Sequence, residues 1–187
     1  MMTAEFPPDR RKSYMEMAEI YFWTTTINQW QKLLWPDAYK DIVIQSLDFL
    51  SDAGKIDVFG FVIMPNHLHL IWRALEMNGK ETPQGSFLKY TAHEFRKKLY
   101  EEDPRQLDNF KVNAHNKYYE FWQRDPLAIH LYTKDVAFQK LHYSHNNPLA
   151  EHWNLAMDRS DYTYSSAKFY EQGIKSFAFL KDLREEF

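Results

Sequence analysis

The sequence contains no cysteine, only five glycines and no long uninterrupted apolar run. The lack of cysteine excludes disulfides, thiolate nucleophiles and cysteine-ligated zinc, so any bound metal must be held by histidine and oxygen donors. The apolar runs are shorter than the roughly 20 residues needed to cross a bilayer. The N-terminus lacks an apolar stretch followed by a small-residue cleavage site. We therefore expect a soluble, cytoplasmic protein without a membrane partner.

The chain also lacks internal repeats, low-complexity tracts and Gly/Ser-rich linkers. A chain of 187 residues can bury about 70% of the surface that it exposes when unfolded, which is enough for one core. We predict a polar N-terminal arm at residues 1–18, a single domain at residues 19–170 and a C-terminal tail at residues 171–187.

Positive charge is scarce, since 23 Lys and Arg face 26 Asp and Glu, a net charge of −3. Nucleic-acid-binding proteins usually neutralise phosphates with Lys and Arg, so this balance argues against that class. Residues 61–150, however, carry 12 basic against 10 acidic residues and seven of the eight histidines. Aromatic residues are abundant at 17%. They fit either an ordinary core or a surface that stacks on unpaired bases.

Hydrophobic periodicity predicts the element order β-α-β-β-α-β-α. This order indicates an α+β fold in which an antiparallel sheet carries helices packed on one face. The charged segment from Glu101 to Asn116 is predicted to be a loop. The expected strands and helices are, in order, 20–27, a helix from Pro36 to before Gly54, 55–64, 67–72, 86–100, 128–132 and 134–147.

The motif His67-Leu68-His69 follows a Pro-Asn turn inside a predicted hairpin. Side chains alternate faces along a strand, so both imidazoles point the same way, about 6.6 Å apart along the backbone, while Leu68 faces the core. Two such histidines can converge on one metal ion and leave coordination positions for substrate oxygen and water. The alternative is that both are surface residues. Imidazole suits manganese or zinc, and a site completed by oxygen donors also accepts magnesium.

A second pattern, YSHNNP, places Tyr143 and Asn147 four residues apart on one helix face. A phenol with its ordinary pKa near 10 costs about 4 kcal/mol to ionise at pH 7, so it attacks only a polarised phosphate. Asn147 precedes Pro148, which is also a common way to end a helix. The pair alone therefore leaves a catalytic and a structural interpretation open.

Three segments together resemble the single-tyrosine HUH transposases. These segments are FVIMPNHLHLIW at residues 61–72, YSHNNP at residues 143–148 and DYTYSSAKFY at residues 161–170. An FWQ segment at residues 121–123 lies between the first two, as it does in those proteins. Within that group the chain is most similar to the REP-associated tyrosine transposases, and the resemblance covers roughly residues 20–170.

The resemblance implies an RRM-like (ferredoxin-like) palm and a role for each matched residue. His67 and His69 match the metal-binding pair, Tyr143 the nucleophile that takes a 5′-phosphate, and Asn147 the residue that completes the metal site. The implied activity is single-stranded DNA cleavage and strand transfer at hairpin-associated sites, with Mg²⁺ or Mn²⁺ and without a nucleotide cofactor.

Two other functions stay open beside this one. They are a DNA-hairpin-binding module without chemistry and a metal-dependent phosphodiesterase without a covalent intermediate. Both a monomer and a homodimer are compatible with the resemblance. Candidate DNA contacts are the basic residues of the 86–100 helix, Lys89, Arg96, Lys97 and Lys98, which could follow a phosphate backbone or form a solvated face.

Overall fold

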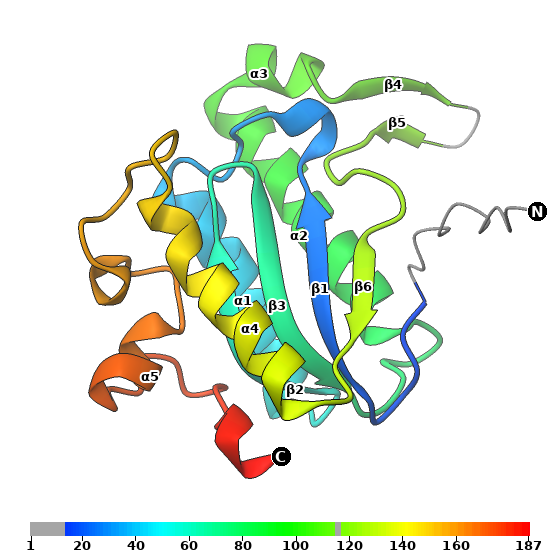
Figure 1. Cartoon of the computed structure of the whole chain (residues 1–187). Coiled ribbons are helices and arrows are strands. Elements are labelled where there is room, and N and C mark those ends of the chain that lie inside the picture. The colour runs from blue at the N-terminus through cyan, green and yellow to red at the C-terminus, as the bar shows by residue number, and fades with distance from the viewer. Residues whose placement is uncertain (1–13, 115–116) are drawn as a thin grey trace, which may run out of the picture.

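The computed structural model describes residues 14–114 and 117–187. Its centre is a four-stranded antiparallel sheet in the order β2-β3-β1-β6. The strands are β1 (Ile20–Thr26), β2 (Ile56–Ile63), β3 (His67–Ala74) and β6 (Leu127–His130). Together with the helices this is the ferredoxin-like βαββαβ arrangement (Figure 1). The predicted α+β class and antiparallel sheet are confirmed.

The helices lie on both faces of the sheet (Figure 1). Helices α1 (Asp37–Asp52) and α2 (Pro83–Glu102) cover one face, as the sequence predicts, while α4 (Lys134–Asn146) crosses the opposite face. Thr82 and Thr133 cap α2 and α4 by accepting a hydrogen bond from a first-turn amide, which satisfies one otherwise unpaired donor. Single-turn 3-10 segments lie at residues 28–30, 147–149, 159–161 and 183–185.

The alternation of side chains divides the core into two layers. Trp23, Leu70 and Trp72 face α1 and α2 and are fully buried there with Phe87. On the other face a smaller apolar cluster lies under α4; it contains Ile20, Phe22, Phe59, Ile71, Leu131, Ala137, Leu141 and Leu183. Because α4 rests on this small cluster, its first turns are anchored while its C-terminal half stays close to the polar end of the sheet.

The segment from Glu101 to Asn116 is not the loop that the sequence predicts. It contains the end of α2, the short helix α3 (Pro104–Asp108) and the strand β4 (Lys111–Ala114), which pairs with β5 (Lys117–Tyr119). Asp103 caps α3, and proline occupies its first position, where no amide hydrogen is needed. The high charge of this segment obscures these local signals, although Leu107 and Phe110 are buried in the main core.

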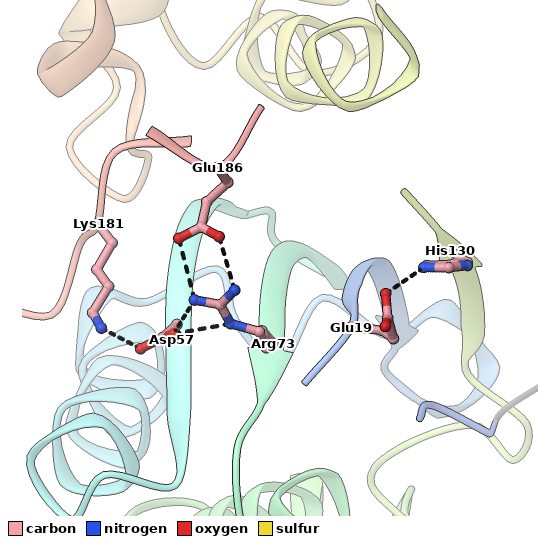
Figure 2. A network of polar contacts seen from close by, with 6 residues as sticks. All are labelled: Glu19, Asp57, Arg73, His130, Lys181 and Glu186. Atoms are coloured by element: carbon pink, nitrogen blue, oxygen red, sulfur yellow. Dashed lines mark hydrogen bonds and ion pairs between the residues drawn. The ribbon is translucent and has the colours of Figure 1, made fainter. Parts of the chain in front are cut away.

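The C-terminal residues pack against the sheet edge formed by β2. Leu180 bridges to Val58, and Leu183 is fully buried under α4. The Arg73 guanidinium contacts the carboxylates of Asp57 and Glu186, and Lys181 also contacts Asp57 (Figure 2). The segment expected as a tail, residues 171–187, therefore contributes to the core. Helix α5 (Ala167–Gln172) ends at the start of this segment.

Most of the predicted N-terminal arm, residues 1–13, lies outside the described residues. Of its remainder, Met15 is buried against the main core. None of the helices in the described part of the chain is both long and apolar enough to cross a membrane.

Candidate active site

Strand β3 presents His67 and His69 toward α4, at the end of the strand next to the β2–β3 turn. In the register of the sheet, Thr26 lies opposite His67 and Thr24 lies opposite His69 on β1. The two imidazole rings are 4.9 Å apart, centroid to centroid. Both side chains are largely buried, and Leu68 between them packs into the main core. The alternation predicted from the sequence therefore places both rings at one location.

Each imidazole is oriented through its Nδ1 atom. The Nδ1 of His67 lies 2.7 Å from the Oδ1 of Asn66, whose amide nitrogen donates to the backbone oxygen of Trp30 at 3.3 Å. The Nδ1 of His69 lies 2.7 Å from the Oγ1 of Thr24. A hydrogen bond from Nδ1–H to an oxygen leaves the Nε2 lone pair free for a metal. The Nε2 of His69 is buried without a hydrogen-bond partner among the described residues.

Both imidazoles are neutral at pH 7. Burial, with a smaller contribution from the neighbouring His152, lowers the pKa of His67 to about 4. Burial lowers the pKa of His69 to about 3, with smaller contributions from His67 and Lys140. Because the charged form is disfavoured, the ring nitrogens remain available as ligands well below neutral pH.

Tyr143 approaches the histidines from α4. Its ring centroid lies 5.4 Å from that of His69 and 6.2 Å from that of Phe22, both in edge-on geometry. Its side chain is 54% exposed, so the phenol is accessible at the cleft. Lys140, one turn earlier, places its ammonium group 6.0 Å from the Tyr143 ring. A phenol and an ammonium group are thus presented together beside the histidine pair.

Asn147 follows the last turn of α4 and lines the same cleft as the histidines and Tyr143. The cleft has a volume of about 530 Å³. It lies between the polar end of the sheet and α4, and its remaining walls come from loops. The residues that line it are Phe22, Thr24, Thr26, Trp30, Asn66, His67, His69, Leu127, Ile129, Lys140, Tyr143, Asn147, His152 and Trp153. All four predicted site residues meet there within one chain.

The donor set fits a divalent cation that takes oxygen ligands. Within residues 14–114 and 117–187 no group of three or more His, Cys, Asp or Glu side chains is placed to hold a metal. The available donors are the Nε2 atoms of His67 and His69 and the side-chain amide of Asn147. Such a mixed set leaves several positions for phosphate oxygens and water, as Mg²⁺ and Mn²⁺ require.

The sequence analysis does not assign a role to several other residues of this site. Thr24 and Asn66 orient the histidines, and Lys140 faces Tyr143. Lys140 could have been found, because it lies three residues before Tyr143 on the same helix face. Trp30 and Trp153 reach the cleft from loops far apart in the chain, so only the tertiary structure brings them together.

The four basic candidates lie elsewhere. Lys89, Arg96, Lys97 and Lys98 belong to α2, across the sheet from the cleft. Lys89 forms an ion pair with Glu81 and Lys98 with Glu102. Arg96 and Lys97 line a separate cavity of about 480 Å³ together with His93, Tyr100, Leu107 and Tyr119. A nucleic acid bound at the cleft reaches these side chains only by passing around the molecule.

No protein-family model and no curated protein sequence matches this chain. Among solved structures, the chain is similar to a REP-associated tyrosine transposase bound to a REP hairpin. The two share 15% sequence identity with a TM-score of 0.57, over 97% of this chain and 93% of the other. At this identity the similarity establishes a shared fold over nearly the whole length of both chains.

Proposed function

We propose that this protein is a metal-dependent single-stranded DNA endonuclease and strand transferase of the transposase type. In this proposal Tyr143 forms a 5′-phosphotyrosine intermediate at a site next to a DNA hairpin. The observation that carries the proposal is the position of Tyr143, whose ring lies 5.4 Å from that of His69 across a cleft that also contains His67 and Asn147.

The chemistry follows from the accessibility of the phenol. The Oη atom of Tyr143 attacks the phosphorus of the scissile phosphodiester, so that an O–P bond forms while the bond from phosphorus to the 3′-oxygen breaks. The phenol proton passes to solvent, and the departing 3′-oxygen takes up a proton. Attack by a second 3′-hydroxyl on the phosphotyrosine reverses these steps and joins the strands. Bond energy is conserved, so no nucleotide cofactor is needed.

The other cleft residues support this attack. Lys140 places positive charge beside the ring of Tyr143, where negative charge develops on the phenol and the phosphate. Thr24 and Asn66 fix the orientation of the histidines, so that both Nε2 atoms are available without reorganisation. A bound Mg²⁺ or Mn²⁺, held by His67, His69 and Asn147, would supply charge neutralisation at a nonbridging phosphate oxygen.

A DNA hairpin is the proposed partner because the structurally similar transposase is bound to one. The shared fold extends over almost all of both chains, which supports this assignment. We propose that the hairpin positions an adjacent unpaired segment in the cleft between α4 and the sheet. The basic residues of α2 are proposed as contacts for the more distant part of the DNA.

A denaturing gel tests the proposed function. Single-stranded oligonucleotides that carry hairpins from the source genome, incubated with the protein and Mn²⁺ or Mg²⁺, should yield a protein–DNA adduct that resists denaturation. EDTA, Tyr143→Phe and His69→Ala should each abolish the adduct. Tyr132→Phe is the matched control, since Tyr132 is 75% exposed outside the cleft and should react like the wild type. An adduct that survives Tyr143→Phe would exclude Tyr143 as the nucleophile.

The alternative of a hairpin-binding module without chemistry has one observation in its favour. The cleft is lined by three histidines, His67, His69 and His152, and by no carboxylate, and within the described residues no three His, Cys, Asp or Glu side chains are placed to hold one metal ion. Tight hairpin binding that is unaffected by EDTA, together with intact DNA after prolonged incubation with Mn²⁺, would support this alternative.

A further inference from the structure

Two of the six tryptophans, Trp30 and Trp153, line the cleft, and a third, Trp35, shares with Trp153 a contact to Lys32. Trp30 is 61% exposed, Trp35 is 52% exposed, and Trp153 is partly buried beside them. The other three, Trp23, Trp72 and Trp122, are buried in the main core. Large aromatic rings on the surface of a protein indicate a binding surface when they are grouped rather than scattered. We call Trp30, Lys32, Trp35 and Trp153 the tryptophan surface.

A cation links two of these rings to each other. The Nζ atom of Lys32 lies 5.4 Å from the Trp35 ring centroid and 5.6 Å from that of Trp153. The Trp153 ring in turn lies 6.1 Å from the ring of His67. The tryptophan surface is therefore continuous with the proposed catalytic site and carries a positive charge at its centre. This combination of π faces and one ammonium group suits a chain of bases and phosphates.

Trp30 is held outward by an unusual backbone. Gln29 and Trp30 both adopt left-handed conformations, with φ of 55° and 57°, which non-glycine residues rarely adopt. Such conformations persist where the surrounding structure requires them, and they cluster at functional sites. Here the Trp30 amide donates to the Ile27 oxygen at 2.9 Å, and its own oxygen accepts the bond from Asn66. Asn66, which contacts the His67 ring, therefore also holds the backbone of Trp30.

The ring of Trp30 stands between two hollows. It lines the catalytic cleft, and it also lines an adjoining cavity of about 120 Å³ with Gln123, Arg124 and Pro126. In the part of the chain that the structure describes, its ring forms no stacked or edge contact with another aromatic ring. A single bound ligand could therefore contact the Trp30 ring and extend into either the cleft or the adjoining cavity.

We propose that the tryptophan surface is a nucleobase-stacking site that grips the unpaired DNA nucleotides next to the phosphate at Tyr143. The assignment of DNA rests on the proposed function, and the stacking rests on the rings themselves. Every base offers a π face, so the grip is tolerant of sequence. Stacking also supplies affinity that does not depend on charge, which suits a chain whose net charge is −3. Lys32 neutralises one phosphate of the bound segment.

Oligonucleotide binding to the full-length protein in EDTA tests this proposal, because no cleavage takes place there. A fluorescently labelled 12-nucleotide oligothymidylate should bind at least tenfold more tightly than an abasic deoxyribose-phosphate strand of the same length. Trp30→Ala and Trp153→Ala should each weaken oligothymidylate binding roughly 5- to 100-fold. The same variants should change abasic-strand binding less than twofold.

Two further variants separate stacking from misfolding. Trp30→Phe keeps an aromatic face and the same backbone, so it should retain most of the affinity that Trp30→Ala loses. Phe49→Ala removes a ring that is 63% exposed on α1 and does not line the cleft, so it should bind oligothymidylate like the wild type.

Equal binding of the abasic strand and oligothymidylate would overturn the proposal, and so would wild-type affinity in Trp30→Ala. Tighter binding of oligouridylate than of oligothymidylate would overturn the assignment to DNA. A chain that prefers bases over the abasic strand but never forms the Tyr143 adduct would support the stacking site while the proposed function fails. A protein that forms the Tyr143 adduct but binds the abasic strand as tightly as oligothymidylate would support the proposed function and overturn the stacking site.

Discussion

His145 is a third buried imidazole. It lies on the buried face of α4 and does not line the cleft. Its Nε2 lies 2.8 Å from the Oγ of Ser166, which accepts from the Phe61 amide at 2.9 Å and donates to the Phe61 oxygen at 3.3 Å. The Nε2–H of His145 therefore donates to Ser166. This chain of bonds fixes α4 to β2 two residues from Tyr143, so we propose that His145 helps to position the Tyr143 side chain.

The burial of His145 predicts a pH-dependent stability. Burial lowers its pKa to about 3, with smaller contributions from His142 and Arg159, whereas the unfolded value is near 6.5. Between these two values the unfolded chain binds more protons than the folded one, so stability falls as pH falls from about 6.5. The slope for this residue is at most about 1.4 kcal/mol per pH unit.

Urea unfolding in EDTA at pH 6.5, 5.5 and 4.5 measures this contribution. The difference between the wild type and His145→Gln isolates it, because His67 and His69 titrate with the same sign in both proteins. The wild type should lose its advantage steadily as pH falls. A difference between the two proteins that stays constant over this range would show that His145 is not neutral in the folded state.

At the residue scale, the sequence predicts the positions of the candidate site residues better than it predicts the residues that orient them. Alternation along a strand suffices to place His67 and His69 on one face, and the i, i+4 spacing suffices to place Tyr143 beside Asn147. Thr24 cannot be assigned in this way, because its contact with His69 depends on the register between β1 and β3. A shift of one residue would turn Thr24 to the opposite face.

Gly60 sets the distance between α4 and the sheet. A Cβ atom at this position would lie 2.6 Å from the Cδ1 of Leu141, and Leu141 is buried in the cluster under α4. The bulge in β2 beside Gly60 shifts the register between β2 and β3. The absence of a side chain at this point allows α4, and with it Tyr143, to approach the histidines closely.

Gly60→Ala should therefore reduce both stability and adduct formation. Overpacking of this kind costs about 1–3 kcal/mol, and the displaced helix moves Tyr143 away from His69. The double variant Gly60→Ala/Leu141→Val removes the clashing methyl group and should recover part of both properties. The free energy of unfolding and the rate of adduct formation are the two measurements. A single variant with wild-type values in both would contradict the role assigned to Gly60.

At the element scale, the sequence correctly predicts the helices and strands that have a strong hydrophobic periodicity. The hairpin of β2 and β3 and the helices α1 and α4 have regular apolar spacing and clear caps, so their positions agree with the prediction within about two residues. The sequence does not predict the hairpin of β4 and β5, because strands of three and four residues are too short to show a periodic pattern. The C-terminal segment packs through Leu180 and Leu183. The spacing of these two leucines does not by itself predict packing, so the sequence indicates a tail there.

For the whole molecule, the acidic balance limits how DNA is held. Lys140 lines the cleft, and Lys32 lies at its mouth, while the basic residues of α2 lie across the sheet. Few phosphates can therefore be neutralised at the cleft itself. Under the proposed function, affinity for a linear strand should therefore depend more on stacking and on metal coordination than on the release of counterions.

The salt dependence of binding tests this distribution of charge. Each phosphate neutralised on a single strand contributes about 0.7 to the magnitude of the slope of log Kobs against log salt concentration, so two or three contacts predict a slope between about −1.4 and about −2.1. Lys140→Gln should reduce the magnitude of the slope by about 0.7. Anisotropy titrations between low and moderate salt provide the measurement. A slope steeper than about −5 would indicate a broad basic surface instead.

The most direct test of the central claim is to find which tyrosine carries DNA. Trypsin cleavage after Lys140 and Arg159 releases the peptide of residues 141–159, in which Tyr143 is the only tyrosine. After reaction with Mn²⁺ and nuclease trimming, mass spectrometry should show this peptide with an added nucleotide joined through its 5′-phosphate. The unmodified peptide, found together with a nucleotide on another residue or with cleaved DNA and no adduct at all, would contradict the account.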